Sequence, residues 1–210
     1  MRIGIFGGSF DPVHTGHLIV AEQCREQANL DQIWFIPSAI APHKPDGATV
    51  TGRQRKEMLD FAIAGHEYFR VSDLELKSGG TSYTVDTMRA ISQSSPEHEL
   101  HLIIGGDSLD EFSTWRDPAG ICALALPIVY SRPGIQAPLD LLKQYVDDSR
   151  MAAIRNLAIE AIQIDISSTL IRERIAARKT VRYLLPRAVE KYIQTNGLYS
   201  QDSNSPVAVQ

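Results

Sequence analysis

Residues 4–17, GIFGGSFDPVHTGH, bring together the groups best suited to binding a phosphate. An apolar run ends at Gly7 and Gly8, where the missing Cβ atoms let the backbone approach a ligand and point N–H groups at it. Ser9 adds a hydroxyl, and the helix predicted from Gly16 offers the positive end of its dipole. The stretch therefore predicts an anion-binding loop. It matches neither a P-loop nor a G-x-G-x-x-G dinucleotide loop.

His14 and His17 lie three residues apart at the start of this predicted helix and would share one of its faces. Imidazoles beside a polyphosphate can donate hydrogen bonds to oxygens that gain charge in a transition state. Each histidine could instead cap the helix or pack in a turn, as lone histidines commonly do. The nearby phosphate loop favours the catalytic interpretation. A zinc site is disfavoured, because the chain has no HExxH or CxxC spacing.

The composition is that of an ordinary globular protein and excludes several functional classes. Apolar residues make up 43% of the 210 residues, charged residues 22%, and the formal net charge is −4. Without a basic run, a broad nucleic-acid interface is not expected. No segment has the length of a membrane span, and no signal peptide is evident. Cys24 and Cys122 fit no metal or redox spacing, so we expect buried, reduced thiols in a cytoplasmic protein.

Strands and helices alternate along the chain. Short apolar runs predict strands at residues 2–6, 33–37, 69–76, 100–104, 124–131 and, more weakly, 158–164. Amphipathic spacing and end signals predict helices from Gly16, from Thr51 with a capping box to Gln54, and at residues 82–93, 168–178 and 187–196. This order predicts an α/β fold with a doubly wound parallel sheet.

Residues 1–199 are expected to form one domain with a helical C-terminal extension, followed by a disordered tail at residues 200–210. Three glycine-rich or polar loops, at 7–17, 105–108 and 165–169, follow apolar strands. Ligands of parallel sheets bind beyond the carboxyl ends of the strands. We therefore expect these loops to converge on one site.

Two motifs resemble those of the nucleotidylyltransferase superfamily. Its HxGH motif is matched by His14-Thr15-Gly16-His17, and residues 166–172, ISSTLIR, resemble its second motif. Within the superfamily the chain is most similar to the bacterial nicotinate-nucleotide adenylyltransferase family, from residue 1 to about residue 199. The further landmarks are Pro42-His43-Lys44, Ser82-Tyr83-Thr84, residues 104–108 (IGGDS), Trp115, residues 131–134 (SRPG) and the closing LYS at 198–200. The resemblance implies a Rossmann-like nucleotidyltransferase fold.

The resemblance implies that ATP and nicotinate mononucleotide give deamido-NAD and pyrophosphate, in NAD biosynthesis. The acceptor is itself a phosphate with a second pKa near 6, so it is mostly ionised at pH 7 and needs little activation. Positioning two anions and stabilising charge on the transferred phosphorus should then do most of the work. Mg²⁺ would be held mainly by the ATP phosphates and water.

Candidate ATP-binding residues come from both ends of the chain. His14, His17 and Arg172 are the candidate catalytic residues, with the Arg172 guanidinium clamping the β- or γ-phosphate. Ser-Ser-Thr before a helix is also an ordinary N-cap sequence. The full predicted ATP site is Gly7, Gly8, Ser9, Phe10, His14, His17, Gly105, Asp107, Ser167, Ser168, Thr169 and Arg172.

Candidate acceptor-binding residues are Lys44, Thr84, Gly106, Trp115 and Arg132. Lys44 would meet the acceptor phosphate, or else be a solvated lysine. Trp115 would stack on the pyridine ring, or else fill the core, and Thr84 would read the carboxylate. Arg132 is not assigned to either nucleotide, and Arg116 fits a surface turn equally well.

Two other functions stay open at this stage. One is a sister enzyme that uses nicotinamide mononucleotide, phosphopantetheine or glycerol phosphate as acceptor. The other is a nucleotide-sensing module without catalysis, against which the intact His14, His17 and Arg172 argue. No nucleic-acid or membrane partner is expected, and the sequence leaves open whether the chain forms a homo-oligomer.

Overall fold

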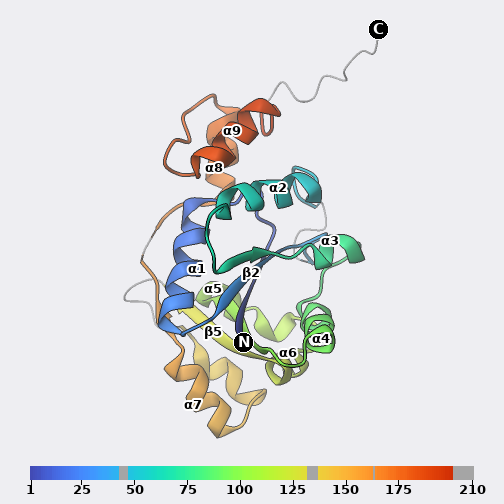
Figure 1. The fold of residues 1–210 in the computed structure, drawn as a ribbon. Coiled ribbons are helices and arrows are strands. Elements are labelled where there is room, and N and C mark those ends of the chain that lie inside the picture. Colours follow the sequence, from blue (N-terminus) through green and yellow to red (C-terminus); the bar gives the residue numbers. More distant parts are fainter. Residues whose placement is uncertain (43–46, 132–136, 163, 201–210) are drawn as a thin grey trace.

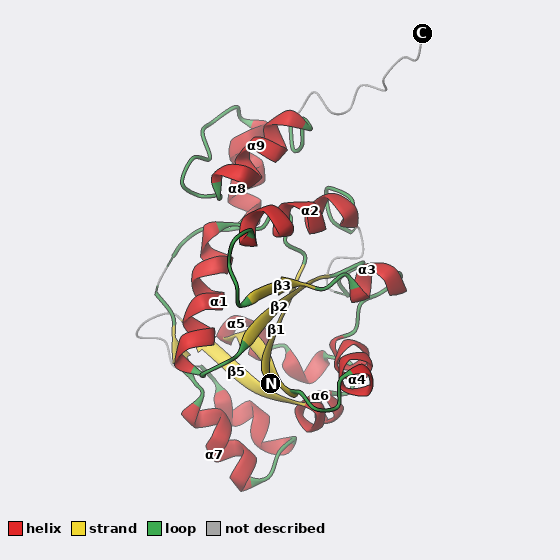
Figure 2. Cartoon of the chain, in the orientation of Figure 1, coloured by secondary structure: helices red, strands yellow, loops and turns green. Residues whose placement is uncertain are grey.

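A six-stranded, all-parallel sheet forms the centre of the computed structural model, which describes residues 1–42, 47–131, 137–162 and 164–200 (Figure 1 and Figure 2). The strand order is β3-β2-β1-β4-β5-β6. The strands are β1 (Arg2–Gly8), β2 (Gln32–Pro37), β3 (Phe69–Val71), β4 (Glu99–Gly105), β5 (Ala125–Ser131) and β6 (Ile159–Glu160). The predicted α/β fold with a parallel sheet is confirmed. The order reverses between β1 and β4, where such sheets bind ligands.

Helices cover both faces of this sheet (Figure 2). They are α1 (Thr15–Gln27), α2 (Gly52–Ile63), α3 (Leu74–Ser78), α4 (Thr84–Ser94), α5 (Gly106–Leu109), α6 (Pro118–Leu124), α7 (Asp148–Asn156), α8 (Ser168–Ala176) and α9 (Arg187–Thr195), with 3₁₀ turns at Phe112–Thr114 and Leu139–Gln144. One apolar core packs α1, α2, α8 and α9 on the sheet, and a second packs α4, α6 and α7 on the other face.

Several predicted elements differ from the observed ones. The predicted strand 69–76 ends at Val71, and its second half forms α3. At this sheet edge β3 pairs with β2 over three residues, whereas Lys77 pairs with Asp73 at 2.9 Å across one helical turn. The weaker strand 158–164 is reduced to the two residues of β6.

Three helices between β4 and β6, α5, α6 and α7, were not predicted from the sequence pattern. Two of them carry end signals that are clear in the structure. The Asp117 carboxylate accepts a hydrogen bond from Gly120 N–H, and Asp147 accepts one from Arg150 N–H. Each of these helices has nine residues or fewer, which leaves little amphipathic pattern to detect.

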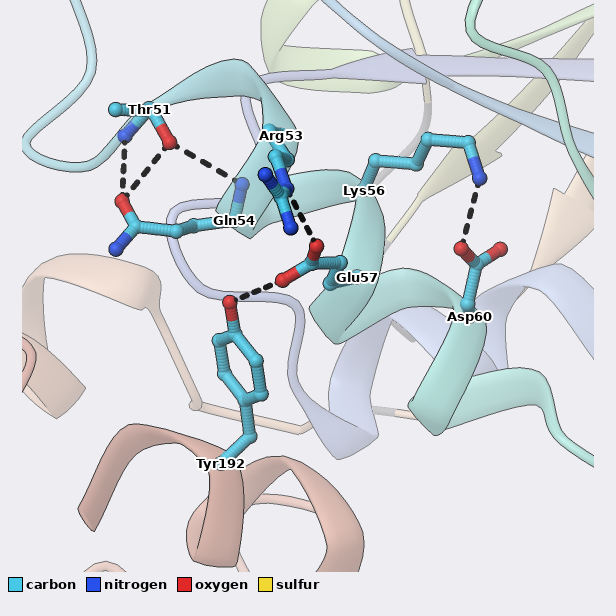
Figure 3. Close-up of polar contacts among 7 residues, drawn as sticks. All are labelled: Thr51, Arg53, Gln54, Lys56, Glu57, Asp60 and Tyr192. Atoms are coloured by element: carbon cyan, nitrogen blue, oxygen red, sulfur yellow. Dashed lines mark hydrogen bonds and ion pairs between the residues drawn. The ribbon is translucent and has the colours of Figure 1, made fainter. Parts of the chain in front are cut away.

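The predicted capping box of α2 is present. Gln54 N–H donates to the Thr51 hydroxyl at 3.3 Å, and Thr51 N–H donates to the Gln54 side chain at 3.0 Å (Figure 3). On the next turn the Tyr192 hydroxyl of α9 donates to the Glu57 carboxylate. This contact fastens the C-terminal helices to α2, and Figure 1 shows them on that side of the sheet.

No helix among the described residues is long and apolar enough to cross a membrane. The predicted free cysteines are confirmed, since Cys24 and Cys122 are both buried and unpaired. Burial raises the pKa of Cys24 to about 12 and that of Cys122 to about 11. The tail predicted to be disordered lies outside the described residues, apart from Ser200.

Candidate active site

A cavity of about 670 Å³ lies at the carboxyl ends of the parallel strands. The structure brings together the three loops singled out in the sequence, those after β1, β4 and β6. Its lining from the candidate set comprises Gly8, Ser9, Phe10, His14, His17, Gly105, Gly106, Asp107, Ser167, Ser168 and Thr169. The volume is in the usual range for a small-molecule site.

His14 and His17 form a stacked pair in this cavity, with ring centroids 3.6 Å apart. His14 is the N-cap residue of α1, and its backbone N–H donates to Nδ1 of His17 at 3.2 Å. That nitrogen must therefore be unprotonated, which places the proton of the neutral His17 ring on Nε2. His17 thus also caps the start of α1, as the alternative interpretation expected. This bond leaves Nε2–H of the ring as a hydrogen-bond donor.

Burial keeps both imidazoles neutral at pH 7. It lowers the pKa of His14 to about 4, and burial together with repulsion from His14 lowers the pKa of His17 well below its usual value. Within the described parts of the chain, Nδ1 of His14 is buried without a hydrogen-bond partner. A buried polar atom in a cavity wall without a partner is a natural contact for a ligand.

Because the folded protein holds these histidines neutral, we expect it to lose stability as the pH falls from about 6.5 to about 4. The unfolded chain protonates its histidines near pH 6.5, whereas folded His14 does so near pH 4. The unfolded state then holds more protons, so the free energy of unfolding falls as the pH falls. For His14 the difference amounts to about 3 kcal/mol over the whole window.

Urea unfolding at about pH 7.5 and pH 5 measures this loss. His14→Gln should lose distinctly less stability than the wild type between the two conditions. His66→Gln is the matched control, since the His66 ring stacks on Phe69 and does not line the cavity. If the free energy of unfolding fell equally in the wild type and in His14→Gln, the lowered pKa assigned to His14 would be contradicted.

The start of α8 contributes hydroxyl groups to the same cavity. Ser167 caps α8, because its hydroxyl accepts from Leu170 N–H at 3.1 Å, as the capping alternative expects. The Ser168 hydroxyl donates to the Pro12 carbonyl at 2.8 Å and so ties α8 to the opening loop. The positive end of α8 therefore lines the same cavity as the histidine pair.

Arg172 lies beside this cavity and does not line it. Its Nη1 donates to the Asp11 carbonyl at 2.8 Å, and its Nη2 donates to the Thr169 hydroxyl at 3.2 Å. The guanidinium is thus attached to the loop that carries His14.

Two other candidate ATP residues have structural roles. Gly7 lies within β1 and does not line the cavity. The Phe10 ring is buried, packs edge-on against Phe6 and Phe35, and lies 5.1 Å from the His17 ring. Phe10 therefore lines the cavity and also packs against the His17 ring.

Of the candidate acceptor residues that the structure describes, Gly106 lines this cavity, whereas Thr84 and Trp115 do not. Thr84 begins α4, and the half-buried Trp115 packs against Phe112 with ring centroids 5.3 Å apart. Arg116 donates to Asp86 at 3.2 Å and covers the Tyr83 ring, so it has partners at the surface. Lys44 and Arg132, like His43, lie outside the described residues.

Sequence reasoning missed three residues that hold the opening loop: Asp11, Arg55 and Tyr199. Arg55 is only 2% exposed and donates to the carbonyls of Ser9 at 2.7 Å and Ser38 at 2.6 Å. Its burial was detectable, because it shares the apolar face of α2 with Met58 and Leu59 at helical spacing. The link from Asp11 to Tyr199 gave no local signal.

No group of three or more His, Cys, Asp or Glu in the described part of the chain could hold a metal ion. Two carboxylates, those of Asp107 and Asp165, do line the cavity, from loops on different strands. These donors fit a metal that arrives with its own phosphate and water ligands better than one caged by the protein.

Comparison with known proteins agrees with the geometry. Residues 5–174 match the family model described as Cytidylyltransferase-like. The chain is 42% identical over 211 residues to a probable nicotinate-nucleotide adenylyltransferase of Trichlorobacter lovleyi, covering 95% of this chain and 99% of that one. It is also 42% identical over 200 residues to the protein of the same name from Salinibacter ruber, covering 95% and 98%.

Solved structures show the same fold at lower identity. The Plasmodium falciparum nicotinic acid mononucleotide adenylyltransferase complexed with NaAD superposes with a TM-score of 0.69 at 18% identity, covering 94% of this chain and 97% of that one. Sequence identity and coverage are sufficient to assign the family. The chain belongs to the cytidylyltransferase-like family and, within it, to the nicotinate-nucleotide adenylyltransferases.

Proposed function

We propose that the cavity transfers the adenylyl group of ATP to nicotinate mononucleotide, giving deamido-NAD and pyrophosphate in NAD biosynthesis. One observation carries the proposal: a pair of neutral imidazoles and the hydroxyl-rich start of α8 line one cavity. The relatives that cover the chain almost end to end support the same acceptor through their names.

The reaction needs little from the protein as an acid or base. An oxygen of the acceptor phosphate attacks the α-phosphorus, the bond from that phosphorus to the bridging oxygen breaks, and pyrophosphate leaves as an anion. The ionised acceptor has no proton to lose, so the reaction needs no general base from the protein. The task is to hold two anions in line.

His17 is proposed to stabilise the charge that develops during transfer. Its Nε2–H donor is fixed by the bond that Nδ1 accepts from His14 N–H. A donor held in place before the reaction costs no reorganisation when charge appears. His14 offers a second ring nitrogen, and the α8 terminus offers backbone N–H groups to the departing pyrophosphate.

Mg²⁺ bound by the phosphates of ATP and by water would neutralise part of their charge. Arg172 is proposed to contribute the fixed positive charge next to the cavity, moving from the Thr169 hydroxyl to a β- or γ-phosphate oxygen.

Acceptor recognition is proposed for Gly106, Thr84 and Trp115, with Lys44 toward its phosphate and Arg132 toward either nucleotide. The Trp115 ring packs at a tilt against Phe112 and is only half-buried, which supports its contact with a pyridine ring. We place the reaction in the cytoplasm, in keeping with two buried cysteines that form no disulfide.

The test is pyrophosphate release from ATP with each acceptor in turn. We expect turnover with nicotinate mononucleotide to exceed that with nicotinamide mononucleotide, phosphopantetheine or glycerol phosphate. Equal or faster turnover with nicotinamide mononucleotide would contradict the acceptor assignment. Binding of both nucleotides without pyrophosphate release would instead identify a nucleotide-sensing module.

A further inference from the structure

Asp11 is a buried residue of the opening loop and contacts three distant parts of the chain. One carboxylate oxygen accepts from the Tyr199 hydroxyl at 2.7 Å, and the other accepts from Thr49 N–H at 2.6 Å. Its backbone carbonyl accepts from Arg172. The side chains of Asp11 and Tyr199 come from residues 188 positions apart, and both are nearly inaccessible, at 5% and 8% exposure.

The environment of this pair explains why the contact is strong. Arg55 lies on the other side of the same loop and donates to the Ser9 carbonyl, so a buried positive charge offsets the buried carboxylate. Burial and the neighbouring Asp11 carboxylate raise the pKa of Tyr199, which keeps its hydroxyl protonated as a donor. Removing that hydroxyl would leave a buried carboxylate oxygen without its partner.

The C-terminal extension contacts the opening loop at two further points. Thr15 N–H, next to His14, donates to the Leu184 carbonyl at 3.0 Å, and Ser168 donates to the Pro12 carbonyl at 2.8 Å. The residues between Asp11 and His17 are therefore held by the C-terminal extension. Since His17 lies at the third position of α1, a shift of the Asp11–Pro12 turn displaces its ring.

We propose that Asp11 and Tyr199 are positioning residues for the adenylyl transfer: their buried hydrogen bond holds the opening loop so that the His14–His17 pair meets the phosphates of ATP. The inference rests on the proposed function. It assigns a role in turnover to the Leu-Tyr-Ser segment at 198–200, none of whose residues lines the cavity.

The experiment compares Tyr199→Phe with Tyr192→Phe, which loses the same hydroxyl from the same extension. The Tyr192 hydroxyl also bonds a carboxylate, Glu57, but on α2 and away from the cavity (Figure 3). At saturating ATP and nicotinate mononucleotide, Tyr199→Phe should lower kcat about 10- to 100-fold. Tyr192→Phe should stay within about two-fold of the wild type.

A second measurement separates positioning from a loss of stability. If Tyr199 acts through the histidine loop, Tyr199→Phe should have little further effect on kcat in a His17→Ala background. If Tyr199→Phe folds poorly, Asp11→Asn gives the same test when it is assayed in the wild-type and His17→Ala backgrounds. Additive losses, or equal kcat values for Tyr199→Phe and Tyr192→Phe, would overturn the inference. A wild-type chain without turnover would instead overturn the proposed function, and the inference with it.

Discussion

Replacing His17 with alanine is expected to lower kcat by about 10²- to 10³-fold while changing the acceptor KM little. The His17 ring lines the cavity, and the hydrogen bond at Nδ1 leaves Nε2–H as its one donor. Such a donor interacts most strongly when charge builds up on the phosphate oxygens, so its removal affects the transition state more than the bound substrates.

Steady-state kinetics with ATP and nicotinate mononucleotide varied independently would separate the two effects. His66→Ala is a matched control, because that ring stacks on Phe69 outside the cavity, and its kcat should equal that of the wild type. A loss confined to the acceptor KM of His17→Ala would assign the ring to substrate binding.

Replacing Arg172 with alanine is expected to reduce kcat/KM for ATP by about 10²-fold, and lysine should restore little of it. The guanidinium is already oriented by the Asp11 carbonyl, and the donor it now gives to the Thr169 hydroxyl would turn to a phosphate oxygen. The lysine ammonium is a point charge and cannot bridge two acceptors in that geometry.

Arg174→Ala provides the control for a change of charge on the same helix. The Arg174 Nε donates to the Thr180 carbonyl at 2.9 Å, so it faces the following loop. We expect kcat/KM for ATP to stay near the wild-type value in this variant. If Arg172→Lys restored the wild-type kcat/KM for ATP, a positive charge alone would be sufficient at this position. If Arg174→Ala lost as much kcat/KM as Arg172→Ala, Arg172 would have no specific role.

Elements with a long, regular pattern could be predicted from the sequence. The buried strands β1, β2, β4 and β5 are continuous apolar runs, and α2 carries a capping box that the structure reproduces. Prediction failed where the apolar pattern is short, or where a local side-chain pair determines whether a segment forms a helix or a strand. The segment that became α3 alternates like a strand, but the Asp73–Lys77 pair favours a helical turn.

The parts of the site that are formed by contiguous stretches of sequence could be predicted. The stretch 7–17 and residues 167–169 meet in one cavity because parallel strands end at one edge of the sheet. The supporting residues Asp11, Arg55 and Tyr199 were not predictable as a group. Asp11 lies in the opening loop, Arg55 in α2 and Tyr199 after α9, and no spacing along the chain encodes contacts between such distant residues.

The attachment of Leu184 and Tyr199 to the opening loop has a consequence during synthesis. The ribosome releases the glycine–histidine segment early, but Leu184 and Tyr199, which bond to it, emerge much later in translation. A nascent chain, or one ended prematurely before these residues, would carry both signature histidines without the contacts that order them. On the proposed positioning role, competence to consume ATP is therefore acquired only once Tyr199 has been translated and has bonded to Asp11.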